Sequence, residues 1–298
     1  MTSNARSSVP ERHAEERPSA SGVFRIGGEL PIHRLGFGAM RITGKGVWGE
    51  PHDRNEAIRV LRRTLELGIN FIDTADSYGP EVSEQLIAEA LHPYPKDLVI
   101  ATKAGFDRNG PGQWTMNGNP KHLREACEGS LRRLKVERID LYQLHRIDPH
   151  YQADDQFGVF KDLQSQGKIR YVGLSEVTVD QIEHAQKIVP VVTVQNRYSL
   201  ADRSYEGVLD HCGREKIGFI PWNPINASNL NALGKELQRV ALHHNITTAQ
   251  VALAWLLWRS PVMLPIPGTS RVVHLEENVA AATLQFDDGE LEALGQAP

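Results

Sequence analysis

The chain has 298 residues, and 33 Lys and Arg stand against 37 Asp and Glu, which leaves a net charge of −4 and a sequence pI of about 6.3. General nucleic-acid binding needs a basic face, so this charge balance argues against it. No apolar run reaches the ~20 residues of a membrane span. The cysteines, Cys127 and Cys212, are too few for a disulfide framework, so we expect a reducing cytoplasm as the compartment.

Residues 1–21 are rich in Ser, Arg, Glu and Pro and contain no apolar segment, which excludes a signal peptide and predicts a disordered N-terminal tail. We find no linker within residues 22–298, so we expect them to form one domain. The 12 His residues show no metal-ligand spacing, so we expect no metal site.

Residues 23–32 alternate around Gly27-Gly28, as in a β-hairpin. Short apolar runs and helical segments then follow one another along the chain. The predicted strands are 35–40, 69–73, 98–101, 139–144, 169–173, 191–194, 217–221 and 262–266. The predicted helices begin at Asp53, Pro80, Pro120, Thr178 and Thr247 or cover 156–167, 202–214, 271–282 and 287–295. We expect Gly-rich loops at 43–52 and 104–119.

Eight strands that alternate with helices predict a parallel sheet closed into a single-domain (β/α)8 TIM barrel, preceded by an N-terminal β-hairpin. A doubly wound open sheet is the alternative. That fold would normally carry a GxGxxG turn after its first strand, and the chain has none there.

Polar groups follow seven of the predicted strands at the point where each strand ends. They are Asp73 with Tyr78, Lys103, His145, Ser175, Gln195, Trp222 and the loop of Gly268, Thr269, Ser270 and Arg271. In a barrel of this kind the active site lies at the carboxyl ends of the strands. The sequence therefore predicts that these groups share one rim.

Four of these side chains suggest carbonyl chemistry. Tyrosine has a reference pKa of about 10, and a nearby Lys103 ammonium would bring the pKa of Tyr78 towards neutrality. Asp73 would hold Lys103 in place, and a neutral His145 could donate a hydrogen bond to a substrate oxygen. None of the four is a hydride source, so a cofactor must supply the hydride.

The contexts NFIDTADSYG, IATK and LYQLH resemble the catalytic tetrad of the aldo-keto reductases. The segments AMRITG, ALAWLL and IPGTSRVVHLEEN are similar to the bacterial pyridoxal reductase-like branch of that family. The resemblance runs from the hairpin to the final helix. It implies that Asp73, Tyr78, Lys103 and His145 are catalytic and that the cofactor is NADPH, with NADH as an alternative.

The resemblance also implies contacts to the cofactor. Ser175 and Gln195 would hold the nicotinamide carboxamide, and Trp222 would stack on the nicotinamide ring. The remaining cofactor contacts would be Gly38, Ala39, Met40, Pro224, the phosphate loop Gly268, Thr269, Ser270 and Arg271, and the adenosine contacts His274, Glu277 and Asn278. Independently of the resemblance, this loop opens a helix, whose free N–H groups favour phosphate.

The chain departs from the family pattern at several positions. Glu176 replaces an Asn, which weakens the expectation of one hydrogen bond to the carboxamide, and Trp222 replaces the more common Tyr. Gly268 replaces a Lys and His274 an Arg, which weakens the expected preference for NADPH. The C-terminal tail is short, so we expect an open pocket whose specificity depends on Trp48, Phe106, Trp114 and the loop 223–228.

The resulting hypothesis is NADPH-dependent reduction of a small aldehyde or ketone to its alcohol, with Tyr78 as the proton donor and pyridoxal as one candidate substrate. A cofactor-binding regulatory subunit that senses redox state and turns over slowly is the alternative. A metal-dependent barrel hydrolase is disfavoured, because only Asp73 and His145 could serve as ligands at these strand ends. Arg41 and Arg146 flank the rim, where a role in anion binding competes with simple solvent exposure. The sequence does not indicate an oligomeric state.

Overall fold

The computed structural model describes residues 18–226 and 234–295. Residues 1–17 of the predicted tail and residues 227 and 228 of the predicted specificity loop lie outside the described residues. Residues Ser19–Ser21 form a short 3-10 turn (η2) in which Ser21 is buried, so the folded chain begins before the predicted boundary. Among the described helices, none is both long enough and apolar enough to cross a membrane.

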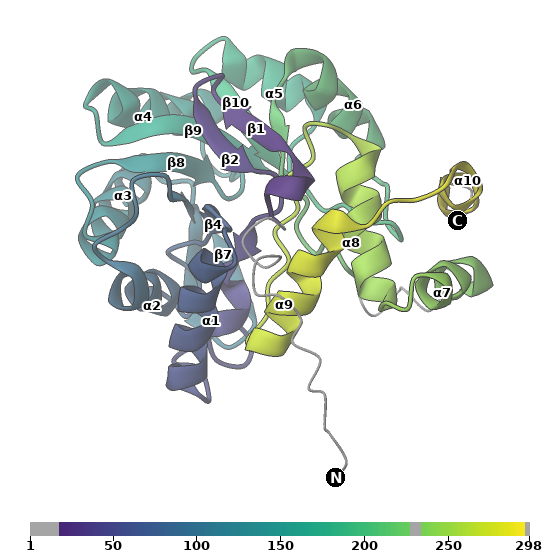
Figure 1. Ribbon diagram of the computed structural model, residues 1–298. Helices are drawn as coiled ribbons and strands as arrows, with labels where there is room; N and C mark the ends of the chain where they lie inside the picture. The colour runs from purple at the N-terminus through teal and green to yellow at the C-terminus, as the bar shows by residue number, and fades with distance from the viewer. Residues whose placement is uncertain (1–17, 227–233, 296–298) are drawn as a thin grey trace.

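A curved parallel sheet of seven strands forms the centre of the molecule (Figure 1). Its spatial order is β11-β10-β9-β8-β5-β4-β3. The strands are β3 (Phe37–Gly38), β4 (Phe71–Asp73), β5 (Val99–Ala104), β8 (Ile139–Leu144), β9 (Ile169–Ser175), β10 (Val191–Gln195) and β11 (Gly218–Phe219).

The predicted eighth strand, 262–266, is extended but forms only an isolated bridge between Met263 and Phe219. The Phe219 N–H donates to the Val262 carbonyl at 2.8 Å. On the other side, the Gly36 N–H donates to the Pro265 carbonyl at 2.9 Å. The segment therefore links β11 to the stretch before β3 and closes the barrel. Proline has no N–H to donate, and Pro265 and Pro267 prevent a longer ladder.

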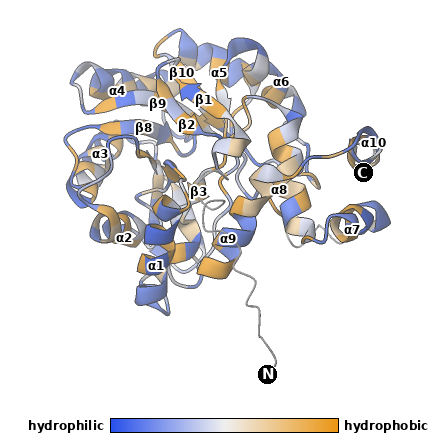
Figure 2. Ribbon diagram, viewed as in Figure 1, coloured by the Kyte–Doolittle hydropathy of each residue, from blue (hydrophilic) through white to orange (hydrophobic). Residues whose placement is uncertain are grey.

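Helices surround the sheet on the outside (Figure 1). Figure 2 shows polar and apolar residues together on these helices, as expected for helices that cover a core. They are α1 (Arg54–Glu66), α2 (Val82–Leu91), α3 (Pro120–Leu134), α4 (Ala153–Ser165), α5 (Val179–Gln186), α6 (Glu206–Glu215), α7 (Gly234–His243), α8 (Thr248–Arg259), α9 (Val272–Ala280) and α10 (Asp288–Gly295). Two short 3-10 turns, η3 (Ala39–Ile42) and η5 (Ala281–Thr283), complete the set.

Four predicted helix starts are confirmed by their caps. Asp53 accepts from the Glu56 N–H at the start of α1, and Asn119 accepts from the Lys121 N–H at the start of α3. Thr178 and Thr247 each form a complete capping box at the starts of α5 and α8. Each cap satisfies a backbone donor that the helix leaves unpaired.

Other boundaries were predicted wrongly. Helix α2 begins at Val82 rather than Pro80, because Glu81 has a left-handed φ of 68°. Helix α6 begins at Glu206 rather than at residue 202, and α4 covers 153–165 rather than 156–167. Helix α7 was not predicted. The predicted loop 104–119 contains an antiparallel hairpin of β6 (Phe106–Gly110) and β7 (Gln113–Met116).

The predicted N-terminal hairpin is confirmed as β1 (Val23–Ile26) and β2 (Leu30–His33). Its side chains Ile26 and Ile32 belong to the apolar cluster inside the barrel, together with Phe71, Val99 and Leu141. The hairpin therefore fills the end of the barrel at which the strands begin. Side chains two residues apart on a strand share a face, so Asp73 follows Phe71 on the inner face.

Candidate active site

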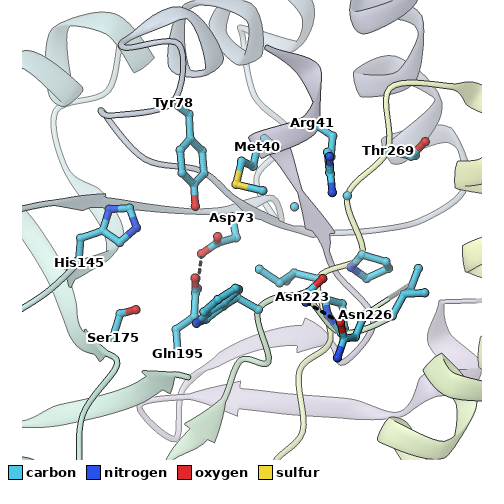
Figure 3. A pocket seen from close by; sticks show the side chains of 18 of the residues that line it. Met40, Arg41, Asp73, Tyr78, His145, Ser175, Gln195, Asn223, Asn226 and Thr269 are labelled. Carbon is cyan, nitrogen blue, oxygen red and sulfur yellow. Dashed lines mark hydrogen bonds between the residues drawn. The ribbon is translucent and has the colours of Figure 1, made fainter. Parts of the chain in front are cut away.

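A cavity of about 870 Å³ opens at the carboxyl ends of the strands (Figure 3). This volume lies within the range of small-molecule and cofactor sites. The structure brings together most of the predicted site residues in its wall: Gly38, Ala39, Met40, Asp73, Tyr78, Phe106, Trp114, His145, Ser175, Gln195, Trp222, Pro224, Gly268, Thr269 and Ser270.

Six predicted residues do not line this cavity. Lys103 is fully buried behind Tyr78, and Trp48 lies behind Arg108, whose guanidinium carbon is 5.8 Å from the Trp48 ring centroid. Arg271 lines a neighbouring cavity of about 540 Å³ together with Arg41, Lys45 and His52. The other three residues lie on α9, where His274 pairs with Glu277 at 2.9 Å and Asn278 is buried.

Lys103 makes three hydrogen bonds at the base of the cavity. Its Nζ donates to Asp73 Oδ1 at 2.5 Å, to the Thr74 carbonyl at 2.8 Å and to Tyr78 Oη at 3.5 Å. An ammonium group has three N–H donors, and these partners account for all of them. Because Tyr78 Oη already accepts from Lys103, its own proton is available to an acceptor in the cavity.

The second carboxylate oxygen of Asp73 is held by two amides. Gln195 Nε2 donates to Oδ2 at 2.9 Å (Figure 3). Gln143 Nε2 donates to the same oxygen at 3.0 Å. Gln143 was not predicted as a site residue. Its position two residues before His145 on β8 could have indicated it, because both side chains then lie on the inner face of the strand.

Burial and charge act in opposite directions on Tyr78. Burial raises its pKa above the ordinary value, and the Lys103 charge offsets that rise only in part. Lys103 thus lowers the pKa of Tyr78 as expected, but burial keeps the net pKa above its ordinary value rather than near neutrality. Burial would lower the pKa of Lys103, but the Asp73 carboxylate reverses this and raises it. Tyr78 is thus a protonated phenol beside a permanent ammonium.

His145 is an uncharged side chain. Burial lowers its pKa well below 6.5, and the charges of Lys103, Arg146 and Arg108 lower it further. Its ring packs edge-on against Phe106, with 4.7 Å between centroids, and against Tyr78 at 6.0 Å. A neutral imidazole can donate one hydrogen bond into the cavity without taking up a proton.

Hairpin β6–β7 forms an aromatic wall next to Tyr78 and His145. Trp114 lies edge-on to Tyr78 at 6.3 Å and to Phe106 at 5.3 Å between ring centroids. The Arg108 guanidinium covers the Trp114 ring at 3.6 Å from its centroid. The planes of Phe106 and Trp114 meet at 74°, so the wall presents two aromatic rings at a steep angle to the cavity.

Ser175 and Gln195, the expected carboxamide contacts, already have protein partners. Arg146 Nη1 donates to Ser175 Oγ at 2.9 Å and to the His145 carbonyl at 2.5 Å. Gln195 uses its amide nitrogen on Asp73, so its amide oxygen is the atom that remains for a ligand. Arg146 lines the cavity, and its contact to Ser175 was not predicted.

Glu176 does not line the cavity and so does not face a ligand there. Its Oε1 instead accepts from Trp222 Nε1 at 2.7 Å and from the Arg197 backbone N–H at 2.7 Å. Glu176, at the position where the resemblance implies an Asn, thus contacts the protein.

The loop that opens α9 differs from the expected phosphate site. The Arg271 N–H donates to Thr269 Oγ1 at 3.1 Å, and the Val272 N–H donates to the Glu56 carboxylate at 3.1 Å. Two N–H groups that were expected to meet phosphate therefore have protein partners. Gly268 is required here, because a Cβ on it would lie 2.6 Å from the Gly38 carbonyl oxygen.

Together these contacts define a barrel site that can hold a carbonyl oxygen between a phenol and a neutral imidazole. The site provides a proton donor. Within the described residues, the groups that could together ligate a metal are His243, His244 and Glu290, and they do not line the cavity. The class of protein is therefore a barrel enzyme for carbonyl and alcohol interconversion that takes its hydride from a bound cofactor.

Comparison with known proteins agrees with this class. Residues 34–297 match the model of the aldo/keto reductase family. A Schizosaccharomyces pombe protein named as an uncharacterized oxidoreductase is 53% identical over 268 residues, covering 90% of this chain and 87% of that protein. Pyridoxine 4-dehydrogenase of Escherichia coli is 41% identical over 281 residues, covering 92% and 98%.

The fold also matches solved structures. An aldo-keto reductase from Klebsiella pneumoniae, crystallised with NADPH, superposes with a TM-score of 0.78 at 24% identity, covering 92% of this chain and 94% of that one. The chain belongs to the aldo/keto reductase family. It is an NAD(P)H-dependent oxidoreductase with the predicted (β/α)8 barrel fold, and its identity to pyridoxine 4-dehydrogenase supports the predicted pyridoxal reductase-like branch.

Proposed function

We propose that the protein reduces an aldehyde to the corresponding alcohol with NADPH and that Tyr78 is the proton donor. The observation that carries this proposal is the set of three bonds from Lys103 Nζ, which leaves the Tyr78 proton directed at an acceptor in the cavity. The high pKa of Tyr78 keeps that proton in place until negative charge develops on a substrate oxygen.

The residues of the cavity fit a nicotinamide cofactor. Ser175 Oγ and the Gln195 amide oxygen suit a carboxamide, and the Trp222 ring suits the face of a pyridine ring. When bound, the reduced nicotinamide supplies the hydride. Tyr78 and His145 would hydrogen-bond the carbonyl oxygen of the substrate. Tyr78 transfers its proton to that oxygen, and the Lys103 charge stabilises the phenolate that remains.

Cationic side chains support NADPH over NADH. Arg41 lines both cavities, and Arg271 and Lys45 line the smaller one, where a further phosphate could be held. The Klebsiella neighbour was solved with NADPH. Against this, Glu56 brings a carboxylate to the start of α9. The contacts of His274, Glu277 and Asn278 with adenosine also belong to this proposal.

Pyridoxal is the substrate that we propose first. A relative at 41% identity carries the name pyridoxine 4-dehydrogenase. The aromatic wall of Phe106 and Trp114 suits contact with an aromatic aldehyde, and Trp48 contributes through its contact with Arg108. Cys127 and Cys212 are buried free thiols, which supports a reducing cytoplasm as the location.

The test is Tyr78→Phe, with Tyr94→Phe as the matched control. The Tyr94 hydroxyl donates to the Leu134 carbonyl and does not line the cavity. We expect Tyr78→Phe to bind NADPH with unchanged affinity while kcat for pyridoxal falls by roughly 10²–10⁴-fold, the usual contribution of a general acid. A near wild-type kcat would show that Tyr78 is not the donor.

The same assay separates the alternatives. Tight NADPH binding with almost no turnover across a panel of aldehydes would support the redox-sensing subunit instead. Loss of activity in a chelator would support a metal-dependent hydrolase.

A further inference from the structure

Trp222 is held on two sides by side chains. Its indole N–H donates to Glu176 Oε1 at 2.7 Å. The Arg197 guanidinium carbon lies 5.8 Å from the centroid of the Trp222 ring. Arg197 is in turn fixed by an ion pair with Asp202 at 2.9 Å. Because Trp222 also lines the large cavity, these contacts determine the angle at which its ring meets a ligand there.

The Glu176 carboxylate is fully engaged with the protein. Besides the indole, Oε1 accepts from the Arg197 backbone N–H at 2.7 Å, and Oε2 accepts from the Tyr205 hydroxyl at 3.2 Å. The backbone contributes as well: Glu176 has a left-handed φ of 56°, and its N–H donates to the Gln195 carbonyl at 3.0 Å. Such a conformation is uncommon outside glycine and requires support from its surroundings.

Glu176 also influences a second residue that lines the cavity. Its charge acts on Arg146, which donates to Ser175 Oγ. Burial lowers the pKa of Arg146, and the Glu176 charge opposes this in part. The direct contact of Glu176 with a residue of the cavity wall is therefore its hydrogen bond with Trp222.

From these contacts we infer that Glu176 is a positioning residue, which orients the Trp222 ring against the nicotinamide rather than touching the cofactor. This inference rests on the proposed function, in which Trp222 packs on that ring. The Asn expected at this position would contact the carboxamide directly. In this chain Glu176 acts through the indole N–H of Trp222. The more common Tyr has no indole N–H and so offers no donor at this place.

The coupling between the two side chains is the quantity to measure. The variants are Glu176→Leu, Trp222→Phe and the double variant, each assayed for the NADPH dissociation constant by fluorescence and for kcat and KM. We expect Glu176→Leu to weaken NADPH binding roughly tenfold, because the half-buried indole donor loses its partner. In the Trp222→Phe background the indole donor is absent, so Glu176→Leu should change NADPH binding by less than about threefold.

Two further variants keep the test independent of folding. Glu176→Gln keeps an acceptor for the indole and for the Arg197 N–H, so we expect NADPH affinity within about threefold of wild type. Tyr205→Phe is the matched control, because it removes only the 3.2 Å bond to Oε2, and we expect unchanged affinity. Thermal melting identifies any variant whose fold is lost.

The outcomes are distinct. Equal effects of Glu176→Leu with and without the indole would overturn the inference and leave the proposed function intact. A wild-type protein that does not bind NADPH would overturn both. A smaller effect in the Trp222→Phe background, with rescue by Glu176→Gln, supports the positioning role.

Discussion

Lys103 and Tyr78 illustrate how one pair of residues is controlled by burial and charge together. Both are buried, which disfavours their charged forms. For Lys103 the Asp73 carboxylate outweighs burial, so the ammonium persists. For Tyr78 burial outweighs the ammonium, so the phenol persists. At neutral pH the site therefore holds Tyr78 as a protonated phenol. The Lys103 ammonium that would stabilise the phenolate is already in place.

This pair predicts the pH dependence of aldehyde reduction. The reaction needs protonated Tyr78, whose pKa is raised, so kcat should stay constant from about pH 6 to pH 9 and fall only above that range. His145 should add no acidic limb near pH 6, because its pKa lies well below 6.5. A pH profile of kcat measures both.

The variant Lys103→Met tests the direction in which Lys103 shifts the pKa of Tyr78. Lys103 lowers the pKa of Tyr78, so its removal should move the alkaline limb to higher pH and reduce kcat by at least tenfold. An alkaline limb that moves to lower pH in this variant would contradict the assignment of that limb to Tyr78.

At the scale of elements, hairpin β6–β7 depends on Arg108 for its position over the site. The guanidinium donates to the carbonyls of Ser77 at 2.6 Å, Gly46 at 3.0 Å and Gln113 at 2.8 Å. It thereby joins the hairpin to the loop that carries Tyr78 and to the Gly-rich loop. A flexible insertion between strand and helix is thus converted into a wall of the cavity.

Arg108→Leu should release this wall. We expect KM for pyridoxal to rise roughly tenfold, equivalent to about 1.4 kcal/mol, while kcat falls less than threefold. Arg124→Leu is the control, since its ion pair with Asp162 is exposed and lies away from the cavity. Steady-state kinetics of both variants provide the measurement, and equal KM values would show that Arg108 does not hold the wall.

Helix α10 is attached to α7 by one carboxylate. Glu290 lies 2.8 Å from His243 Nδ1 and 3.0 Å from His244 Nε2. Burial would raise the pKa of Glu290, but these hydrogen bonds outweigh it and lower the pKa from 4.5 to about 2. Because the pKa of Glu290 is lower in the folded state than in the unfolded state, the charged carboxylate stabilises the fold above pH 4.5. This stabilisation is lost as the pH falls towards 2.

The consequence is a pH-dependent stability difference. Glu290→Gln should melt below wild type at pH 7, and the difference should shrink as the pH falls from 4.5 towards 2, because Glu290 takes up its proton first in the unfolded chain and only near pH 2 in the folded one. Melting temperatures across this range test it. A difference that stays constant with pH would show that the charge of Glu290 does not stabilise the α7–α10 contact.

For the whole molecule, the closure of the barrel is the feature that the individual elements do not specify. Gly38 and Gly268 face each other across the seam, and a Cβ on Gly38 would lie 2.6 Å from the Ile266 carbonyl oxygen. The seam has few backbone bonds because Pro265 and Pro267 lie in it, so close packing replaces the missing ladder.

Gly38→Ala should therefore lower the free energy of unfolding by about 1–3 kcal/mol, the usual cost of overpacking. Gly158→Ala is the matched control, because Gly158 lies within α4 and a Cβ there would meet nothing within 4 Å. The control should be neutral or stabilising by up to about 1 kcal/mol. Urea unfolding measures both, and a neutral Gly38→Ala would show that the seam is not tightly packed.

Much of this protein could be predicted from short stretches of sequence. The strands, the caps Asp53, Asn119, Thr178 and Thr247, and the polar groups after each strand depend on neighbours within a few residues, so local patterns reveal them. The barrel follows from their alternation, and the shared rim follows from the barrel.

The partners of those groups depend on contacts between distant parts of the chain, and only the folded molecule decides them. Gln143 on Asp73, Arg146 on Ser175 and Glu176 on Trp222 join residues that lie on, or just after, different strands. The net rise of the Tyr78 pKa likewise required its burial to be known. The physical reason is that sheet curvature and register set these distances, and neither is encoded in a local pattern.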